Sequence, residues 1–286
     1  MSLIVAVLLS YRESAASSPL LEQKNRNRGL KTQPLPIPEP DRTPPTQKKD
    51  PPTTTPTPKP KDQQLIFAPP PQLRGTTFYQ GTLDNKIKAI ALTFDDGPSP
   101  YTLKILEILQ RQNIKATFFC LGANLQTYPE IAKRVVKEGH AIGNHTWHHL
   151  YRNVDVATAA AEIDNTAVHI YRATGAKSFL FRPPGGRLNN GLAAYAKKKN
   201  YVVVMWSIDT KDFLMPPATS LAYDVLLQAR SGAVVLMHDG GGNRAQTVQA
   251  LPEIIKGLKQ KGYRFVTIPE LLIQQTKKQE TAGTKS

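Results

Sequence analysis

Two adjacent carboxylates and a pair of histidines are the residues of this sequence best suited to bind a metal ion. Asp95 and Asp96 follow an apolar run, where two neighbouring carboxylates are costly unless a cation neutralises them. His145 and His149 are four residues apart, which places both imidazoles on one face if the segment is helical. Two imidazoles and one carboxylate are the protein ligands of a catalytic metal site whose fourth position holds water. The pattern predicts such a site, although each pair taken alone could be a turn or ordinary core histidines.

Three further residues could complete a hydrolytic site. His238 ends the apolar run 234–237; a histidine opposite a metal is a candidate general acid, whereas a lone one there is usually a core residue. Asp212 could orient that histidine and hold its proton. Arg182 would be costly to bury alone and needs a carboxylate partner, for which Asp95 is the natural candidate.

These polar residues follow strand-like runs that alternate with helix-like segments. The alternation predicts a parallel sheet with helical crossovers, and an incomplete (β/α) barrel and an open doubly wound sheet both fit the length. In such folds the carboxyl ends of the strands carry the active site, so polar clusters after separate strands should meet at one edge. Strands are expected at 87–94, 116–121, 141–143, 179–182, 201–206, 233–237 and 264–267, and helices at 101–112, 129–138, 157–174, 190–199, 220–230 and 245–261.

Five motifs, in this order, resemble those of the NodB-homology domain, the polysaccharide deacetylases of carbohydrate esterase family four. The resemblance extends over about residues 88–273 and is specific, because all five motifs occur at plausible separations. It implies an α/β fold, a distorted and incomplete (β/α) barrel with about seven parallel strands. The motifs are Thr93–Pro98, Asn144–His149, Arg182–Gly186, Asp209–Phe213 and Leu236–Asp239.

The resemblance implies a role for each matching residue. Asp95 corresponds to the catalytic base and Arg182 to the residue that holds it. His238 corresponds to the catalytic acid and Asp212 to the residue that tunes it. The implied metal ligands are Asp96, His145 and His149, and the implied oxyanion and acetyl pocket is formed by Gly185, Leu236 and Phe213. The implied cofactor is one divalent metal ion, with zinc as the default and cobalt or nickel as alternatives.

Two positions depart from the family pattern. The third motif usually carries a tyrosine where this chain has Gly185, so the backbone N–H is kept but an aromatic wall and some rigidity are expected to be lost. The fourth motif usually ends in tryptophan, and Phe213 leaves a smaller apolar wall.

The implied function is metal-dependent removal of N-acetyl groups from a cell-surface polysaccharide. Peptidoglycan N-acetylglucosamine is the favoured substrate, and chitin-type oligomers come second. Two alternatives remain open: an O-deacetylase of acetylated xylan that uses the same site, and a non-catalytic glycan-binding module. The formal net charge of +15 fits an anionic wall polymer. The basic residues are scattered and no nucleic-acid-binding motif accompanies them, so no nucleic-acid partner is expected.

The remaining sequence features bear on organisation and location. Residues 1–18 are expected to be a signal peptide or the remnant of a membrane anchor, with a disordered N-terminus as the alternative. Residues 19–74 are rich in Pro, Thr and Lys and predict a disordered spacer that could attach the protein to membrane or cell wall. The deacetylase domain is expected at 75–276, and a polar tail at 277–286. This order predicts an extracytoplasmic protein, and the oligomeric state stays open.

Cysteine content and hydropathy exclude some classes of protein. The single cysteine, Cys120, excludes an intramolecular disulfide framework and a thiolate-rich zinc site. No apolar run reaches the ~18–20 residues that a membrane-spanning helix needs.

Overall fold

Strands and helices alternate along the described residues, which are 64–84 and 86–283 of the computed structural model. The strands are β1 (Ile66–Phe67), β2 (Thr77–Phe78), β3 (Ala89–Gly97), β4 (Thr117–Cys120), β5 (Ala141–Asn144), β6 (Lys177–Ser178), β7 (Leu180–Phe181), β8 (Val202–Val204), β9 (Ile208–Asp209), β10 (Ala233–His238) and β11 (Arg264–Phe265). The helices are α1 (Pro100–Gln112), α2 (Gly122–Thr127), α3 (Pro129–Lys137), α4 (Val156–Thr174), α5 (Leu192–Lys198), α6 (Ala218–Gln228), α7 (Ala245–Gln260) and α8 (Ile268–Gly283).

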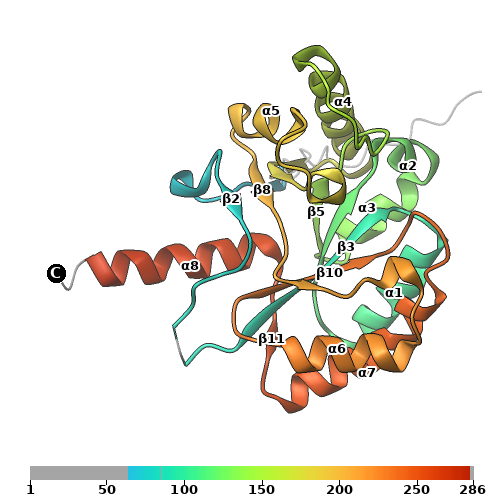
Figure 1. Ribbon diagram of the computed structural model, residues 1–286, viewed down its shortest axis with the longest axis vertical. Coiled ribbons are helices and arrows are strands. Elements are labelled where there is room, and N and C mark those ends of the chain that lie inside the picture. Colours follow the sequence, from blue (N-terminus) through green and yellow to red (C-terminus); the bar gives the residue numbers. More distant parts are fainter. Residues whose placement is uncertain (1–63, 85, 284–286) are drawn as a thin grey trace, which may run out of the picture. The chain divides into compact units, whose positions relative to one another are not determined.

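One curled parallel sheet organises these elements (Figure 1). Its order is β2-β8-β7-β5-β4-β3-β10-β9, and β11 pairs with the start of β3. Among the described residues β2 and β9, at the two ends of this order, do not pair with each other, so the barrel is incomplete. The expected distorted (β/α) barrel is therefore confirmed, and the open doubly wound alternative is wrong. The prediction of about seven strands missed two short strands, β2 and β9, which pair with β8 and β10.

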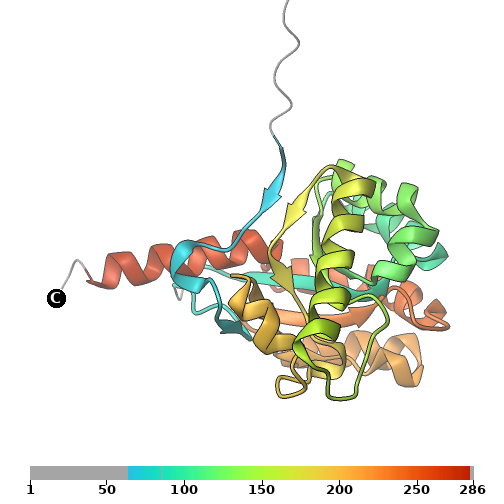
Figure 2. The same ribbon diagram turned by 90° about the horizontal axis from the view of Figure 1, so that it is seen from above.

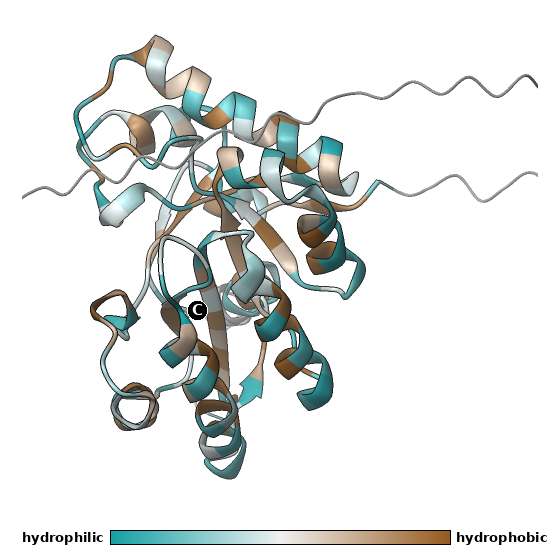
Figure 3. Cartoon of the chain, turned by 90° about the vertical axis from the view of Figure 1, so that its right-hand side faces the viewer, coloured by the Kyte–Doolittle hydropathy of each residue, from teal (hydrophilic) through white to brown (hydrophobic). Residues whose placement is uncertain are grey.

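Helices cover the outside of this curve. They follow one another in the order α6, α7, α1, α3, α4 and α5, each in contact with the next. On β3, Ile90, Leu92 and Phe94 face this outer layer and pack with α1 and α7, while Ala89 and Ala91 face the interior. In Figure 3 the strands are largely brown, and helices show brown and teal in alternation, the pattern of elements buried on one side.

The interior is filled by small and branched side chains from the strands and by one helix. Leu271 and Leu272, on α8, are completely buried and pack with inward residues of the sheet such as Val202 and Val234. The rest of α8 extends beyond the sheet when the domain is seen from above (Figure 2). The interior is apolar at this end, which leaves the other end of the strands for polar residues.

Regular structure extends beyond the limits expected for the domain. Ahead of Gly75, the apolar residues Ile66–Phe67 form β1, which pairs with β6. The predicted tail from 277 continues α8 to Gly283, since residues 274–280 include good helix formers and neither glycine nor proline. The N-terminal segment 1–18 and the spacer up to residue 63 lie outside the described residues. None of the described helices combines the length and apolarity needed to cross a membrane.

Candidate active site

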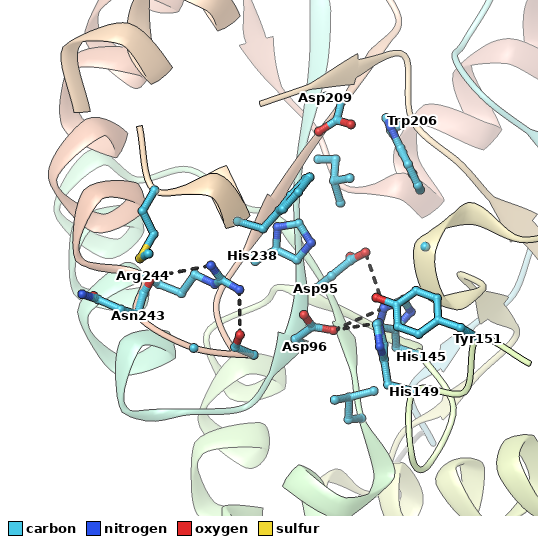
Figure 4. Close-up of a pocket in the computed structure, with 17 residues that line it drawn as sticks. Asp95, Asp96, His145, His149, Tyr151, Trp206, Asp209, His238, Asn243 and Arg244 are labelled. Atoms are coloured by element: carbon cyan, nitrogen blue, oxygen red, sulfur yellow. Dashed lines mark hydrogen bonds and ion pairs between the residues drawn. The ribbon is translucent and has the colours of Figure 1, made fainter. Parts of the chain in front are cut away.

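The carboxyl ends of the strands surround a pocket of about 640 Å³ (Figure 4). All but two of the predicted site residues line it. Arg182 and Asp212 instead lie behind the wall, where they contact residues that do line the pocket. The predicted residues that line the pocket are Asp95, Asp96, His145, His149, Gly185, Phe213, Leu236 and His238.

A bulge in β3 turns both adjacent carboxylates toward the pocket. In a regular strand, Asp95 and Asp96 would point to opposite faces of the sheet. The register of β3 against β4 shifts between Asp95 and Gly97, and Asp96 adopts a φ of 72°. Such a conformation is costly for a residue other than glycine and persists only where the surroundings stabilise it. Asn124, which donates to the Asp96 carbonyl over 2.7 Å, is one such support.

The two histidines come from a loop and not from a helix, so the loop conformation and not helical periodicity brings them together. His145 directly follows β5, and no helix lies between it and the start of α4 at Val156. Thr146 and His149 both have positive φ, of 71° and 60°, and the His149 N–H donates to Thr146 Oγ1 over 3.1 Å. The buried Glu162 of α4 also holds this loop, since it accepts hydrogen bonds from the backbone N–H groups of Trp147 and His148 at 2.9 and 2.8 Å.

Asp96, His145 and His149 have the donor set and spacing of a divalent metal site. Their ligand atoms all lie within 4.8 Å of one another, and the two Nε2 atoms are 3.4 and 3.3 Å from Asp96 Oδ1. That oxygen is buried and has no hydrogen-bond donor. His145 Nδ1 lies 2.7 Å from the Arg182 carbonyl oxygen, which can only accept, so Nδ1 carries the proton and the Nε2 lone pair faces the site. These residues therefore fit a divalent ion.

Electrostatics in the triad agree with this assignment. Burial alone would raise the pKa of Asp96, but the neighbouring imidazoles of His145 and His149 hold it well below its ordinary value. Burial lowers the pKa of His149, and the neighbouring His145 lowers it further. Ionised Asp96 and neutral His149 are in the states that coordinate a metal. Against the effect of burial, Asp95 and Asp96 raise the pKa of His145, so metal binding would displace a proton from that imidazole.

Arg182 fixes Asp95 from within the interior. Its guanidinium is fully buried and donates to Asp95 Oδ1 at 2.7 Å and Thr93 Oγ1 at 2.8 Å. It also donates to the carbonyls of Val204 and Met205, at 3.0 and 3.1 Å. Because the buried charge has both a counterion and neutral acceptors, its desolvation is offset and Asp95 is held in one orientation.

His238 and Asp212 form a second fixed pair across the pocket. His238 Nδ1 lies 2.6 Å from Asp212 Oδ1, and the His238 N–H donates to Asp212 Oδ2 at 2.9 Å. Thr247 donates to the same Oδ2. Burial alone would lower the pKa of His238, but the hydrogen bond and charge of Asp212 raise it above its ordinary value. His238 is thereby suited to carry a proton at neutral pH, with Nε2 free to donate it.

The aromatic wall that Gly185 was expected to lose is supplied by Tyr151. A Cβ at Gly185, where φ is 55°, would lie only 2.6 Å from the Tyr151 ring, so a larger residue there would displace this tyrosine. Tyr151 lines the pocket and stacks edge-on against His149, with ring centroids 4.9 Å apart. Phe213 is about half exposed and lies edge-on to His238, and the buried Leu236 completes the wall.

Several pocket residues were not found by the sequence analysis. Tyr151 lies two residues after His149, close enough to be a candidate, but its ring direction depends on the loop conformation. Trp206 and Met215 also line the pocket. Arg244 lies in the wall formed by the glycine-rich segment after β10, in which the analysis singled out no residue.

Comparison with known proteins agrees with the geometry. Residues 82–204 match the polysaccharide deacetylase family. The chain is 41% identical over 207 residues to a peptidoglycan-N-acetylglucosamine deacetylase of Bacillus cereus, covering 70% of this chain and 96% of the relative. The crystal structure of the Bc1960 peptidoglycan N-acetylglucosamine deacetylase aligns with a TM-score of 0.65 and 37% identity, over 70% of this chain and 94% of that one.

A second solved structure shows that the fold does not guarantee activity. A pseudoenzyme of carbohydrate esterase family four from Bacillus anthracis, BA3943, aligns with a TM-score of 0.63 and 30% identity, over 68% of each chain. The extent of the similarity, the incomplete barrel and the five motifs at its rim together lead to one assignment. This chain belongs to the polysaccharide deacetylases, the NodB-homology enzymes of carbohydrate esterase family four.

Proposed function

We propose that this chain is a metal-dependent hydrolase that removes the N-acetyl group from N-acetylglucosamine in peptidoglycan. One observation carries the proposal: the Asp96, His145 and His149 triad lies beside a fixed carboxylate, Asp95, and opposite a fixed imidazole, His238, in one pocket. Hydrolysis of an amide needs a base for water and an acid for the departing amine, and the pocket offers one of each.

The triad would hold one divalent ion, with zinc as the first candidate and cobalt or nickel as alternatives. When bound, such an ion supplies a Lewis acid that makes a water molecule more acidic and polarises the acetyl carbonyl. Asp95 lies 3.7 Å from His145 Nε2, close enough to the triad to accept the proton of the attacking water. Arg182 holds this carboxylate in one orientation, because it pairs with the oxygen remote from the triad.

His238 is the acid of the proposed reaction. It would protonate the nitrogen of the tetrahedral intermediate, so that the sugar leaves as a neutral amine and acetate is released. Asp212 favours the protonated imidazole and orients it toward the pocket. The Gly185 N–H is the proposed oxyanion donor, an interaction typically worth ~3–4 kcal/mol of barrier. Leu236, Phe213 and Tyr151 would enclose the acetyl group and the sugar.

The substrate assignment rests on similarity and charge. The relative and the Bc1960 structure are peptidoglycan N-acetylglucosamine deacetylases by name. A net charge of +15 favours an anionic wall polymer over a neutral one. A peptidoglycan substrate places the protein outside the cytoplasm, and the N-terminal residues 1–74 are proposed to export it and to attach it to membrane or wall.

Acetate release before and after metal replacement tests the proposal. Chelator-treated protein is assayed on peptidoglycan and on N-acetylglucosamine oligomers, with and without added zinc, alongside His145→Ala and Asp95→Asn. Zinc should restore release in the wild type, and both variants should lose at least ~100-fold. Asp84→Asn, at an exposed aspartate outside the pocket, is the matched control and should retain activity.

Two outcomes would contradict the proposal. Release from acetylated xylan alone would identify an O-deacetylase that uses the same residues. Glycan binding without release from any of these substrates, with the metal bound, would identify a non-catalytic binding module; the family pseudoenzyme BA3943 is an example of this fold without catalysis.

A further inference from the structure

Arg244 is a buried cation in the pocket wall for which the proposed reaction has no use. It is only 5% exposed and directly precedes α7, after the segment Gly240–Asn243. Figure 4 shows it across Asp95 and Asp96 from His149 and Tyr151, with its guanidinium pointing into the pocket. A substrate held at the metal ligands would therefore extend toward it.

Arg244 has no acidic partner, in contrast to Arg182. Its guanidinium donates to the carbonyls of Gly240 and Gly241, at 2.6 and 2.9 Å, and over 3.4 Å to that of Asn243. Within the described part of the chain, no carboxylate lies in ion-pair distance of it. Five N–H donors belong to a guanidinium, so these bonds leave donors available. A charge this buried without a counterion is costly, and an anionic ligand would offset that cost.

The surroundings of Arg244 strengthen its attraction for an anion. It lies at the positive N-terminal end of α7, a helix of 16 residues with no acidic residue in its first turn. Gly241 lies between Arg244 and Asp96: a Cβ there would lie 2.6 Å from Asp96 Oδ2 and 3.4 Å from Arg244 Nη2. Asp96 is already engaged by His145 and His149, so it does not neutralise the guanidinium.

We propose that Arg244 binds a carboxylate carried by the glycan beside the sugar that loses its acetyl group. The inference rests on the proposed function and specifies its substrate. In peptidoglycan every second sugar bears a lactyl ether. Its carboxyl group is amide-linked where a peptide stem is attached and is a free carboxylate where the stem has been removed, whereas chitin-type oligomers carry no such group. A planar guanidinium can bind such a group with two parallel hydrogen bonds, which gives orientation as well as affinity. Arg244 thereby selects wall-glycan strands without peptide stems over a neutral polymer with the same N-acetyl group.

The first test changes the substrate and leaves the protein intact. Zinc-loaded wild type is assayed on a tetrasaccharide of alternating N-acetylglucosamine and N-acetylmuramic acid with free lactyl carboxylates, and on its methyl ester. The free acid should be preferred by roughly 10-fold or more in kcat/KM, the range of a charge-assisted hydrogen bond. Equal kcat/KM on acid and ester would overturn the inference. If neither compound releases acetate, the proposed function fails, and the ratio of their dissociation constants decides the inference instead.

The second test assigns the preference to one residue. Arg244→Gln should bring the acid-to-ester ratio close to one, and Arg244→Lys should give an intermediate ratio. Arg187→Gln is the matched control, because Arg187 is exposed and lies over the opposite wall at Tyr151; it should keep the wild-type ratio. The same loss of ratio in Arg187→Gln, or an unchanged ratio in Arg244→Gln, would overturn the inference. If Arg244→Gln does not fold or does not bind zinc, the ratio of kcat/KM on acid and ester in the wild type decides.

A free carboxylate distinguishes substrate recognition from product binding. Acetate, the product, is added as an inhibitor to the wild type and to Arg244→Gln. Acetate inhibition that weakens in Arg244→Gln, together with an acid-to-ester ratio of one in the wild type, would assign Arg244 to the product and overturn its role in glycan selection. A ratio that favours the acid, with equal acetate inhibition in both proteins, supports the glycan carboxylate.

Discussion

Removal of the buried Arg182 should destabilise the domain far more than removal of any exposed cation. Arg182 is fully buried, and its ion pair with Asp95 is 2.7 Å long. Arg182→Met would leave that carboxylate buried without its counterion, which costs about 3–5 kcal/mol. Each of the Val204 and Met205 carbonyls that loses its donor would add about 1–3 kcal/mol. Domains are stable by about 5–15 kcal/mol, so this single change should remove most of the stability.

A double-mutant cycle separates the ion pair from the rest of this loss. Asp95→Asn alone should also destabilise, since it leaves the buried guanidinium facing a neutral partner. The double variant should then be more stable than the sum of the single changes predicts, by about 2–3 kcal/mol. Urea denaturation of metal-free protein, followed by circular dichroism, measures all four free energies of unfolding. Chelator is present throughout, because bound metal would stabilise the native state by itself.

An exposed ion pair provides the control. Lys256 and Glu253 lie 3.8 Å apart on α7, with side chains 65% and 60% exposed, and their cycle should give a coupling below about 0.5 kcal/mol. Equal coupling in the two cycles would refute the argument that burial makes the Arg182–Asp95 pair essential. A loss below about 1 kcal/mol in Arg182→Met would refute it as well.

Three further changes test other parts of the structure. Asp212→Asn removes the charge that raises the pKa of His238, so that pKa should fall and less of the acid should be protonated at neutral pH. The descending limb of kcat/KM against pH should therefore move to lower pH, and an unmoved limb would contradict the assignment. Glu162→Gln should lower zinc affinity about 10–100-fold in competition with a chelator, because the carboxylate that accepts from the N–H groups of Trp147 and His148 is lost. Unchanged affinity would show that other contacts hold this loop. Leu271→Ala should cost about 2–4 kcal/mol in urea denaturation, and the exposed Ile273→Ala less than 0.5 kcal/mol; similar losses would mean that α8 does not close the interior.

Element positions were predictable because their signals are local. The helix expected at 101–112 begins one residue earlier, at Pro100, since Ser99 and Thr102 form a capping box. It ends at Gln112 because Asn113 adopts the left-handed conformation that stops a helix. The strands β2 and β9 were missed because two-residue strands have no period to detect, and only their partners in the sheet define them.

The site was predictable in composition and less so in geometry. Parallel strands place their carboxyl ends at one edge, so polar residues that follow separate strands had to meet there. The spacing of His145 and His149 places them on one face only if the segment is helical, and the spacing alone does not show whether a helix or a loop produces the proximity. The expected loss of an aromatic wall at Gly185 was wrong, since Tyr151 comes from a different loop.

The sequence by itself determined which chemical groups meet at the rim of the barrel: a pair of carboxylates, two histidines, and a third histidine with a remote aspartate partner, all at or after the ends of apolar runs. Only the tertiary structure decided which way they point. Asp95 and Asp96 both face the pocket because a bulge against β4 forces Asp96 to positive φ. Arg182 pairs with Asp95, which is 87 residues away in the sequence, while no carboxylate of the described chain lies within ion-pair distance of Arg244. Side-chain direction and charge pairing depend on neighbours remote in the chain, and a local pattern carries no information about them.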